Sequence, residues 1–361
     1  MSKRIGLMSM QRVVNYGSFL QAYALKRLIE KAGDTEVEFI DYVFERSLVK
    51  RDIERRSIVG RILLNRNIPY YIKKKMYLRK RDQLHSKNLE GIGITNQRNT
   101  NNDLDVLVIG SDEVFNCMQP YPVGYSRGLF GKGYSDSSVI SYAASFGHTK
   151  LHQLIEYGIK DEIAELLRQF SAISVRDVNS SSIVSELTGK TPALHLDPVL
   201  IYDFSNERTS IKKIEQKYII LYAYTDRLTK EEERYIKAFS KKMKMKIISI
   251  GNYQRIADEN IACHPFDVFD YFENASYVIT DTFHGTIFSI RTHAHFCTIL
   301  RDSNRNKLHY LLSKLQCADR EVSELSDIDK LFLIKKNYVE TEKILNSERE
   351  KTMNFLKEFC R

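Results

Sequence analysis

The sequence predicts an α/β protein with two domains, each built around a parallel sheet, and three observations support this. The chain has 361 residues, which is more than a single hydrophobic core usually supports. Its composition is that of a globular protein, with 43% hydrophobic and 28% charged residues. Short apolar runs alternate with amphipathic stretches, as in strand–helix–strand units with parallel strands.

The first half of the chain begins with a predicted strand, a helix and a second strand. The first strand covers residues 5–10, and the helix over residues 18–32 repeats apolar residues on one face until Gly33 ends it. The second strand covers residues 36–40. Further strands are expected at residues 104–109, 139–143, 172–175 and 196–201, with a helix at 151–170.

A polar run at residues 202–217 is the predicted domain boundary, because the strand–helix pattern starts again after it. Expected strands then cover residues 218–222, 246–250, 277–280 and 296–300, and expected helices cover residues 229–242, 267–274, 285–291 and 339–359. We therefore predict an N-terminal domain over residues 1–204 and a C-terminal domain over residues 205–361. Two Rossmann-like domains that face a cleft, closed by a C-terminal helix, form a GT-B-like architecture.

Positive charge is concentrated in one segment of the chain. The net charge is +9, yet residues 46–87 alone hold 14 Lys and Arg against three acidic residues. The remainder is close to neutral, so we do not expect the protein to bind nucleic acid. We interpret residues 46–88 as a basic helical insertion in the N-terminal domain. It mixes apolar and basic residues: Tyr70, Tyr71, Met76 and Leu78 lie among Lys73, Lys74, Lys75, Arg79, Lys80 and Arg81.

Two interpretations of this basic segment stay open. It is either a solvated insertion or a helix that lies on an anionic membrane surface, where basic and apolar side chains both contribute to binding. No apolar run approaches the roughly 20 residues that span a bilayer, and the N-terminus has no signal-peptide pattern. We therefore expect a cytoplasmic protein, which in the second interpretation lies at the inner face of the cell membrane.

Cysteine and histidine usage predicts neither a disulfide framework nor a metal site. The five cysteines are odd in number, scattered and without a C-x-x-C pair, which favours a reducing compartment. His293 and His295 form an H-x-H motif but have no carboxylate or cysteine partner nearby in the sequence. We expect no metal and no cofactor.

Small, polar and ionisable residues follow several predicted strands, at the edge where parallel sheets bind ligands. The set contains one arginine, one histidine and several carboxylates, which suits an anionic ligand with proton-transfer groups beside it. Its members are Asn15, Gly17, Ser18, Gly110, Ser111, Asp112, Ser145, Arg176, Asp177, Asp281, Thr282, His284, Gly285 and Thr286.

Each group also has a purely structural interpretation. Asn15 is a candidate helix N-cap, and without a complete G-x-G-x-x-G pattern we do not expect dinucleotide binding. Asp112 ends a stretch typical of an Asx-turn. Arg176 forms either a surface ion pair or a planar fork for phosphate or carboxylate, and Asp177 caps the helix after it. His284 is either a structural histidine or a group that titrates near neutrality beside an anion at a helix N-terminus.

The same segments resemble the polysaccharide pyruvyltransferase family, in the family's order and over nearly the whole chain. No single motif is specific, but the ordered set is. The matching stretches are Asn15-Tyr16-Gly17, Leu20-Gln21-Ala22-Tyr23-Ala24-Leu25, Gly110-Ser111-Asp112-Glu113-Val114-Phe115-Asn116, Ser141-Tyr142-Ala143-Ala144-Ser145-Phe146-Gly147, Ser174-Val175-Arg176-Asp177, Leu196-Asp197-Pro198-Val199-Leu200, Thr280-Asp281-Thr282-Phe283-His284-Gly285-Thr286 and the C-terminal residues 337–356.

The resemblance implies a GT-B-like fold and transfer of pyruvate from phosphoenolpyruvate to two hydroxyls of a sugar. The product would be a cyclic ketal on a surface polysaccharide or on its lipid-linked precursor. By the resemblance, Arg176 holds the donor's phosphate or carboxylate and His284 is catalytic. Some members carry an arginine where this chain has Thr282. That anion contact is either missing here or supplied from elsewhere, with Arg291 and Arg301 as candidates.

The chemistry gives each candidate residue an expected role. Phosphoenolpyruvate becomes an electrophile when its methylene carbon is protonated, and His284 would supply that proton or assist phosphate departure. Asp112 would accept the proton of the attacking hydroxyl. Arg176 and two helix N-termini would neutralise the donor, which we expect on the C-terminal domain with the acceptor on the N-terminal domain. The remaining donor-binding candidates are Asn15, Gly17, Ser145, Asp281, Thr282, Gly285 and Thr286.

Two other functions stay open from the sequence. A GT-B glycosyltransferase that uses a nucleotide-sugar would share the fold and would differ by an apolar or aromatic slot for the base. A non-catalytic carbohydrate-binding relative would bind ligands without releasing phosphate. The partners expected for the favoured function are phosphoenolpyruvate and a sugar acceptor. If a lipid diphosphate carries that acceptor, an anionic membrane surface is a further partner.

Overall fold

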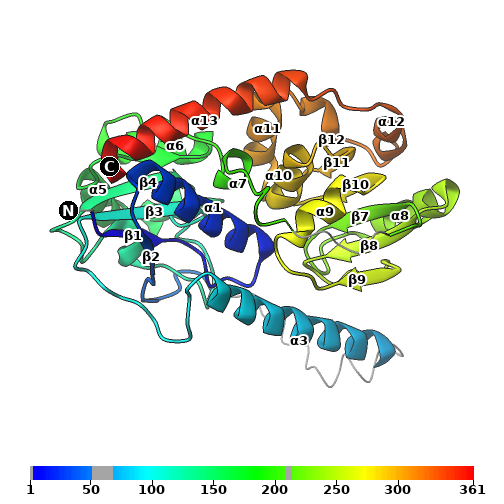
Figure 1. Cartoon of the computed structure of the whole chain (residues 1–361), viewed down its shortest axis with the longest axis horizontal. Coiled ribbons are helices and arrows are strands. Elements are labelled where there is room, and N and C mark those ends of the chain that lie inside the picture. Colours follow the sequence, from blue (N-terminus) through cyan, green and yellow to red (C-terminus); the bar gives the residue numbers. More distant parts are fainter. Residues whose placement is uncertain (1–2, 51–67, 209–213) are drawn as a thin grey trace.

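The computed structural model describes residues 3–50, 68–208 and 214–361, and these form two α/β domains (Figure 1). Each domain contains a six-stranded sheet, and all strand pairs in the described sheets are parallel. The predicted fold class is therefore confirmed. The first part of the predicted basic insertion, residues 51–67, and residues 209–213 of the predicted boundary run lie outside the described residues.

The N-terminal sheet has the strand order β2-β1-β3-β4-β5-β6. Its strands are β1 (Ile5–Met8), β2 (Val37–Ile40), β3 (Val106–Asp112), β4 (Ser138–Ala144), β5 (Ser174–Val175) and β6 (Ala193–Leu194). Strands β1 and β3 are buried along their whole length, as expected where helices cover both faces of a parallel sheet. The helices are α1 (Tyr16–Gly33), α4 (Leu151–Glu156), α5 (Lys160–Arg168), α6 (Val178–Thr188) and α7 (Pro198–Ile201).

The C-terminal sheet has the strand order β12-β11-β10-β7-β8-β9. Its strands are β7 (Tyr218–Tyr222), β8 (Lys246–Ile250), β9 (Glu259–Ile261), β10 (Tyr277–Thr280), β11 (Phe296–Ile299) and β12 (Glu321–Val322). The helices are α8 (Lys230–Met243), α9 (Asp267–Glu273), α10 (Phe283–Arg291), α11 (Arg305–Lys314) and α12 (Asp327–Leu333). The predicted boundary at residues 204/205 falls between the two sheets, and the domain limits themselves stay a prediction.

In both sheets the strand order reverses at one point. The reversal lies between β1 and β3 in the N-terminal sheet and between β7 and β10 in the C-terminal sheet. Open parallel sheets bind ligands in the crevice that such a reversal leaves at the carboxyl ends of the strands. The fold therefore provides one candidate crevice in each domain.

The C-terminal helix α13 (Val339–Cys360) packs on both domains. The Thr341 hydroxyl donates to the Leu315 carbonyl of the C-terminal domain at 2.8 Å. Further along the helix, the Thr352 hydroxyl lies 2.9 Å from the hydroxyl of Tyr142 in β4. The predicted closing helix is therefore present, and it crosses from one domain to the other.

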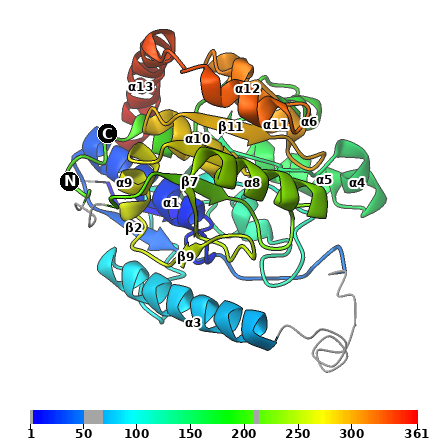
Figure 2. The same ribbon diagram turned by 90° about the vertical axis from the view of Figure 1, so that its right-hand side faces the viewer.

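Helix α3 (Ile68–Gly91) also reaches both domains, on the opposite side of the molecule from α13 (Figures 1 and 2). Lys74 pairs with Asp226 of the C-terminal domain at 2.8 Å, and the His85 ring packs edge-on against Phe19 of α1. Within the described ranges, we find no helix with the length and apolar character needed to cross a bilayer.

Three predictions of secondary structure are wrong. The insertion predicted to be helical from residue 46 is not helical at residues 46–50, where Arg46 forms an isolated bridge with Tyr125. The strand predicted at residues 196–201 is mostly the short helix α7, because Asp197 caps it and Pro198 occupies its first turn, where a missing N–H is tolerated. The single helix predicted at residues 151–170 is two helices, α4 and α5. Gly158 lies between them with a left-handed φ of 65°, which interrupts the helix.

Candidate functional site

The crevices at the two strand-order reversals meet in one cleft of about 340 Å³. The N-terminal domain contributes the loop after β1, the start of α1 and the end of β3. The C-terminal domain contributes the start of α10, the loops after β7 and β8, and one side chain of α11. The lining residues are Met10, Val13, Val14, Asn15, Ser18, Asp112, Glu113, Gln119, Arg176, Tyr224, Asn252, Phe283, His284 and Lys307.

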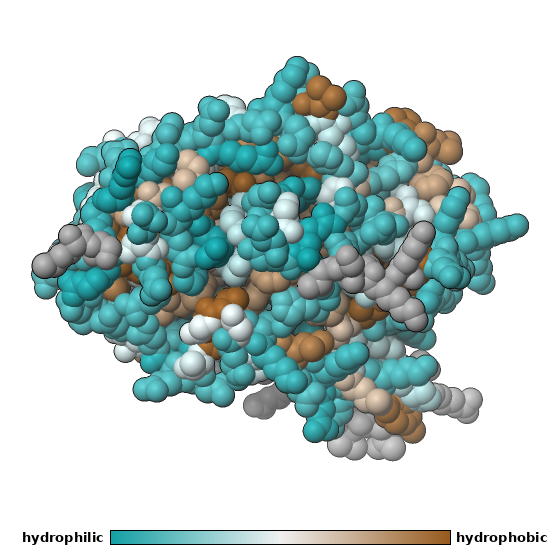
Figure 3. Space-filling view, viewed as in Figure 1, coloured by the Kyte–Doolittle hydropathy of each residue, from teal (hydrophilic) through white to brown (hydrophobic). Residues whose placement is uncertain are grey.

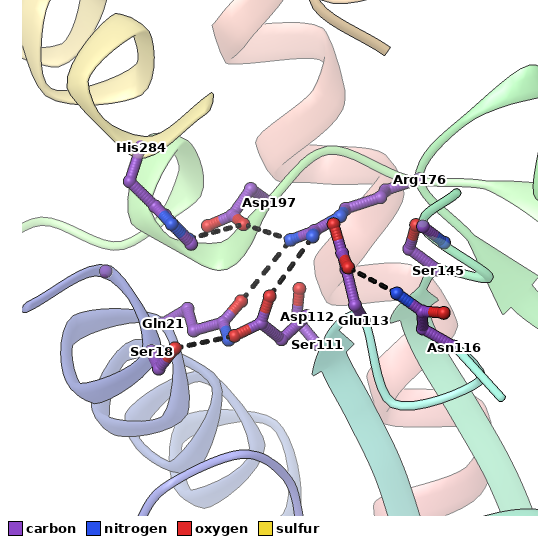
Figure 4. Close-up of polar contacts among 12 residues, drawn as sticks. Ser18, Gln21, Ser111, Asp112, Glu113, Asn116, Ser145, Arg176, Asp197 and His284 are labelled. Atoms are coloured by element: carbon purple, nitrogen blue, oxygen red, sulfur yellow. Dashed lines mark hydrogen bonds and ion pairs between the residues drawn. The ribbon is translucent and has the colours of Figure 1, made fainter. Parts of the chain in front are cut away.

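Arg176 follows β5 and is deeply buried, with 2% of its side chain exposed. Its Nη1 donates to Asp197 at 3.0 Å and its Nη2 donates to Asp112 at 3.2 Å (Figure 4). The guanidinium also lies 4.6 Å from the ring centre of Phe283, which belongs to the other domain. The interpretation of Arg176 as part of a surface ion pair is therefore wrong. Its guanidinium is buried and already binds two carboxylates.

Asp112 ends β3 in a left-handed conformation with a φ of 79°, which is uncommon outside glycine. The Ser18 hydroxyl, at the start of α1, donates to its second oxygen at 2.7 Å. Burial raises the pKa of Asp112, but the positive charge of Arg176, with smaller contributions from His284 and the Ser18 hydrogen bond, holds the pKa below its ordinary value. The carboxylate is therefore ionised at neutral pH and able to accept a proton.

His284 lies in the first turn of α10, which Thr282 caps by accepting from the Gly285 N–H at 2.9 Å. Its ring packs so closely on α1 that a Cβ at Gly17 would overlap the imidazole. His284 Nε2 is buried, has no hydrogen-bond partner and lies 3.8 Å from Asp197. Burial, together with the positive charges of Arg176 and Lys307, lowers the pKa of His284 by more than the nearby carboxylates raise it, so the imidazole is neutral at pH 7 in the empty cleft.

A further ion pair in the cleft, unlike those of Arg176, joins the two domains. Lys307 of α11 donates to Glu113, which follows β3, at 2.6 Å. Glu113 also accepts from Asn116 Nδ2 at 2.7 Å. Burial raises the pKa of Glu113, but Lys307, with smaller contributions from Arg176 and Asn116, lowers it to about 2. The domains are thus linked by a charge-assisted hydrogen bond between side chains that border the ligand space.

Three buried nitrogens of this group have no hydrogen-bond partner: Gln21 Nε2, Arg176 Nε and His284 Nε2. A buried polar atom left unpaired costs about 1–3 kcal/mol. Several such atoms in one place therefore indicate a site that binds something further. Figure 4 shows the three side chains converging from different elements of both domains.

Three other predicted residues have clear structural roles. Asn15 lines the cleft and caps α1, accepting from the Gly17 N–H at 2.7 Å. The Ser145 hydroxyl donates to Asp177 at 2.6 Å and does not line the cleft. Asp177 caps α6 by accepting from the Ser180 N–H at 2.8 Å, which confirms its predicted role as a cap.

Four further candidates hold the start of α10 and do not line the cleft: Asp281, Thr282, Gly285 and Thr286. Asp281 pairs with Arg301 at 3.1 Å and with Arg227 at 3.4 Å. Arg291 lies at the far end of α10 and pairs with Asp203. The two candidates to replace an arginine at position 282 were Arg291 and Arg301. Neither of them lines the cleft. Donor contacts for all these residues stay predictions.

Among the residues that the structure describes, no group of three or more His, Cys, Asp or Glu side chains could hold a metal ion. His293 of the H-x-H motif lies 2.8 Å from a Glu342 oxygen, and His295 lies 2.9 Å from the Leu331 carbonyl. Both histidines thus have structural partners. That the protein needs neither a metal nor a cofactor stays a prediction.

The fold and the cleft define a GT-B-like protein with an ionisable site between its two domains. The chain belongs to the polysaccharide pyruvyl transferase family, which matches residues 15–303. Lys307 lies just beyond the end of that match. No curated protein matches the chain.

Solved structures share the fold at low sequence identity. UGT89C1 of Arabidopsis thaliana, complexed with quercetin, has a TM-score of 0.50 and 11% identity, with 100% of both chains covered. A putative UDP-N-acetylglucosamine 2-epimerase from Listeria monocytogenes also has a TM-score of 0.50, at 9% identity, with 98% of this chain and 94% of that chain covered. These similarities concern the fold alone.

Sequence reasoning missed Lys307 and gave Gln21 no role beyond its place in a family motif, although a signal for each was present. Lys307 comes after the strand predicted at residues 296–300. Because ligands bind beyond the carboxyl ends of parallel strands, this position was itself a signal. Gln21 lies three residues after Ser18 on the same face of a helix. Glu113 entered the sequence analysis only as a member of a family motif.

Proposed function

We propose that the protein transfers pyruvate from phosphoenolpyruvate to two hydroxyls of one sugar, on a polysaccharide or its lipid-linked precursor, and so forms a cyclic ketal. Membership of the polysaccharide pyruvyl transferase family supports transfer of a pyruvyl group to a polysaccharide. The observation that carries the finer proposal is the convergence in one cleft of an arginine, a neutral histidine with an unpaired nitrogen, and an ionised carboxylate.

The proposed reaction adds one hydroxyl across the double bond of the donor and uses a second hydroxyl to displace phosphate. A proton adds to the methylene carbon, which becomes a methyl group. The first hydroxyl oxygen bonds to the adjacent carbon while its own proton leaves. The second hydroxyl oxygen then bonds to the same carbon, the carbon–oxygen bond to phosphate breaks, and the second proton leaves with the phosphate.

His284 is the proposed proton carrier for the methylene carbon. Burial keeps its imidazole neutral in the empty cleft, and the negative charge of a bound donor would raise its pKa. The donor would thereby favour the protonated form of the residue that reacts with it. The proton would be transferred from Nε2, the ring nitrogen that has no partner in the protein.

Asp112 is the proposed base for the attacking hydroxyl. Its lowered pKa keeps it ionised, and the Ser18 hydroxyl fixes one of its oxygens. The starts of α1 and α10 supply N–H groups and dipoles that favour an anion between them. Arg176 keeps one buried donor, Nε, without a hydrogen-bond partner.

We place the acceptor on the N-terminal side. A groove of about 430 Å³ adjoins the cleft and shares Met10, Val13 and Val14 with it. Its walls include Tyr42 and Phe44, and both its volume and its mainly apolar lining fit a small-molecule site. An acceptor sugar whose neighbouring groups lie in this groove would present its hydroxyls to Asp112.

The exposed face of α3 supports the second interpretation of the basic segment, a membrane contact. Figure 3 shows hydrophobic side chains among hydrophilic ones in the outer part of this region. The exposed apolar residues recur every fourth position, and basic residues flank them: Ile68, Ile72 and Met76, with Lys73, Lys75, Arg79 and Lys80. Such a face suits an anionic membrane surface, where a lipid-linked acceptor would be located.

Co-sedimentation with vesicles that contain anionic lipid tests the membrane contact. Replacing Lys73, Lys75, Arg79 and Lys80 by Gln should abolish sedimentation at low salt, and high salt should weaken it for the wild type. The matched control replaces four exposed lysines around the end of α8 by Gln: Lys237, Lys241, Lys242 and Lys244. Equal sedimentation of the α3 variant and the wild type would refute the contact.

Donor choice tests the main proposal. Phosphoenolpyruvate should raise the unfolding temperature, and incubation with a panel of lipid-linked sugars should release phosphate and add the mass of one pyruvyl ketal to an acceptor. Stabilisation by a nucleotide-sugar alone would instead support a glycosyltransferase. Donor binding without phosphate release on any acceptor would support a non-catalytic carbohydrate-binding protein.

A further inference from the structure

The two cations that line the cleft in the described structure, Arg176 and Lys307, differ in how firmly the protein holds them. Arg176 binds two carboxylates, stacks on Phe283 and has 2% of its side chain exposed. Lys307 has a single carboxylate partner, Glu113, and 17% of its side chain is exposed. An incoming anion therefore reaches Lys307 more easily than it reaches the two outer nitrogens of Arg176.

Glu113 would keep a partner if Lys307 moved away. Its second oxygen accepts from Asn116 Nδ2 at 2.7 Å. Asn116 is itself fixed, because its carbonyl oxygen accepts from the Thr149 hydroxyl at 2.7 Å and from the Met118 N–H at 3.1 Å. Gly147 packs against this pair so closely that a Cβ there would overlap the Glu113 carboxylate. The carboxylate is thus held in place independently of the lysine.

Lys307 also lies where a donor would bind. It lies 5.6 Å from the ring centre of Phe283, the residue that precedes His284 at the start of α10. The Arg176 guanidinium also lies over the Phe283 ring. The two cations therefore border one space beside His284, the proposed proton carrier. Asp112 and Glu113 line the cleft, and the buried Asp197 pairs with Arg176, so three carboxylates stand against these two cations. A further anion therefore needs a cation released from its present partner.

We propose that Lys307 binds an anionic group of the donor, phosphate or carboxylate, and exchanges Glu113 for it when the donor enters the cleft. This inference rests on the proposed function, because it concerns the donor of that reaction. Glu113 is then an internal competitor that occupies the donor-binding lysine while the cleft is empty. Its release from Lys307 would couple donor binding to the contact between the two domains.

Opposite effects of two substitutions test the exchange. Titration calorimetry with phosphoenolpyruvate should show that Lys307→Met weakens binding at least tenfold and that Glu113→Gln tightens it several-fold. Glu113→Gln removes both the competitor and a negative charge next to the donor, whereas a pair that only clamps the domains would weaken binding in both variants. Lys74→Met, which breaks the ion pair between α3 and Asp226 outside the cleft, is the matched control and should bind the donor as the wild type does.

Parallel titrations with inorganic phosphate and with pyruvate identify the anionic group and separate the two proposals. Loss of affinity for only one of them in Lys307→Met assigns that group to the lysine. Lysine-dependent phosphate binding without any binding of phosphoenolpyruvate would uphold the lysine site and refute the proposed donor. If the wild type binds phosphoenolpyruvate, the donor is supported. Unchanged affinity for it in Lys307→Met, or weaker affinity in Glu113→Gln, would then overturn the exchange alone. Failure of the wild type to bind any of the three would overturn both proposals.

Discussion

The two walls of the cleft are chemically different. The N-terminal wall contains the carboxylates Asp112, Glu113 and Asp197, and Arg176 bridges two of them. The C-terminal wall is formed largely by the start of α10, with a neutral imidazole and an aromatic ring. Its one cation in the described structure, Lys307, is paired with a carboxylate of the opposite wall.

This difference indicates which kind of ligand group each wall suits. Carboxylates suit hydroxyl groups, whose protons they can accept, and a helix N-terminus with a lysine suits an anion. The ion pairs of both walls are formed before any ligand binds, while Arg176 Nε and His284 Nε2 have no partner. The comparison therefore predicts that substitutions on the C-terminal wall affect the donor first, while those on the N-terminal wall affect stability as well.

The largest effect is expected at His284. His284→Asn keeps a polar side chain against Gly17 but cannot carry the proton, so turnover should fall by about 10²–10⁴-fold. Phosphate release from phosphoenolpyruvate in the presence of acceptor measures this, and the unfolding temperature shows that the fold is kept. His293→Asn, which changes a histidine paired with Glu342 outside the cleft, is the control. Turnover within a few-fold of wild type would leave His284 with a structural role only.

Arg176→Lys tests the N-terminal wall. Lysine has no fork to hold Asp112 and Asp197 together, so one buried carboxylate loses its partner. The free energy of unfolding should fall by about 3–5 kcal/mol, and donor affinity should weaken severely because the unpaired Nε is lost too. Urea unfolding and titration calorimetry measure the two effects. A variant as stable as wild type would show that this ion network does not hold the wall together.

The two walls should lose stability in different pH ranges. The folded pKa of His284 lies below its unfolded value of about 6.5, so the unfolded state binds more protons and stability falls as the pH drops below about 6.5. The folded pKa of Glu113 is about 2, so its contribution is complete above about 4.5 and is lost as the pH falls from there toward 2.

Urea unfolding at a series of pH values separates these ranges. His284→Asn should reduce the dependence that begins near pH 6.5, to which other buried histidines such as His195 also contribute, and leave the lower range unchanged. Glu113→Gln should do the reverse. If both variants change the same range, the walls do not titrate independently and the comparison fails.

The smallest effect is expected from the cap of α10. Thr282→Ala removes the acceptor for the Gly285 N–H and should lower the free energy of unfolding by about 1 kcal/mol. Thr229→Ala removes the matching cap of α8, which does not line the cleft, and should have a similar effect on stability. Donor affinity should weaken a few-fold in Thr282→Ala alone. Equal donor affinity in the two variants would argue against an anion at the start of α10.

The elements predicted most accurately are those that local pattern determines. The strands at residues 218–222, 246–250 and 277–280 were predicted with their observed limits, because each is a short apolar run buried in a parallel sheet. The segment 196–201 also looked like such a run. There the capping aspartate and the following proline favour a helical turn over a strand.

The candidate site was predictable only in part, for a physical reason. Asp112, Arg176 and His284 were found because each follows a strand at the same edge of its sheet. The contact between Arg176 and Asp112 joins residues 64 positions apart, and the contact between Lys307 and Glu113 joins residues 194 apart in different domains. Such pairing depends on how the domains meet, which no local pattern in one sequence encodes.

Helix α13 has a consequence for the order of events during synthesis. Its Thr352 contacts Tyr142 of β4, and its Phe355 packs at a tilt against His195 with ring centres 4.8 Å apart. Yet the helix follows every strand of the second sheet in the chain. A ribosome must therefore translate the second domain before the first can complete its packing. A nascent chain stalled before residue 339 should be digested faster within its first domain than the released protein.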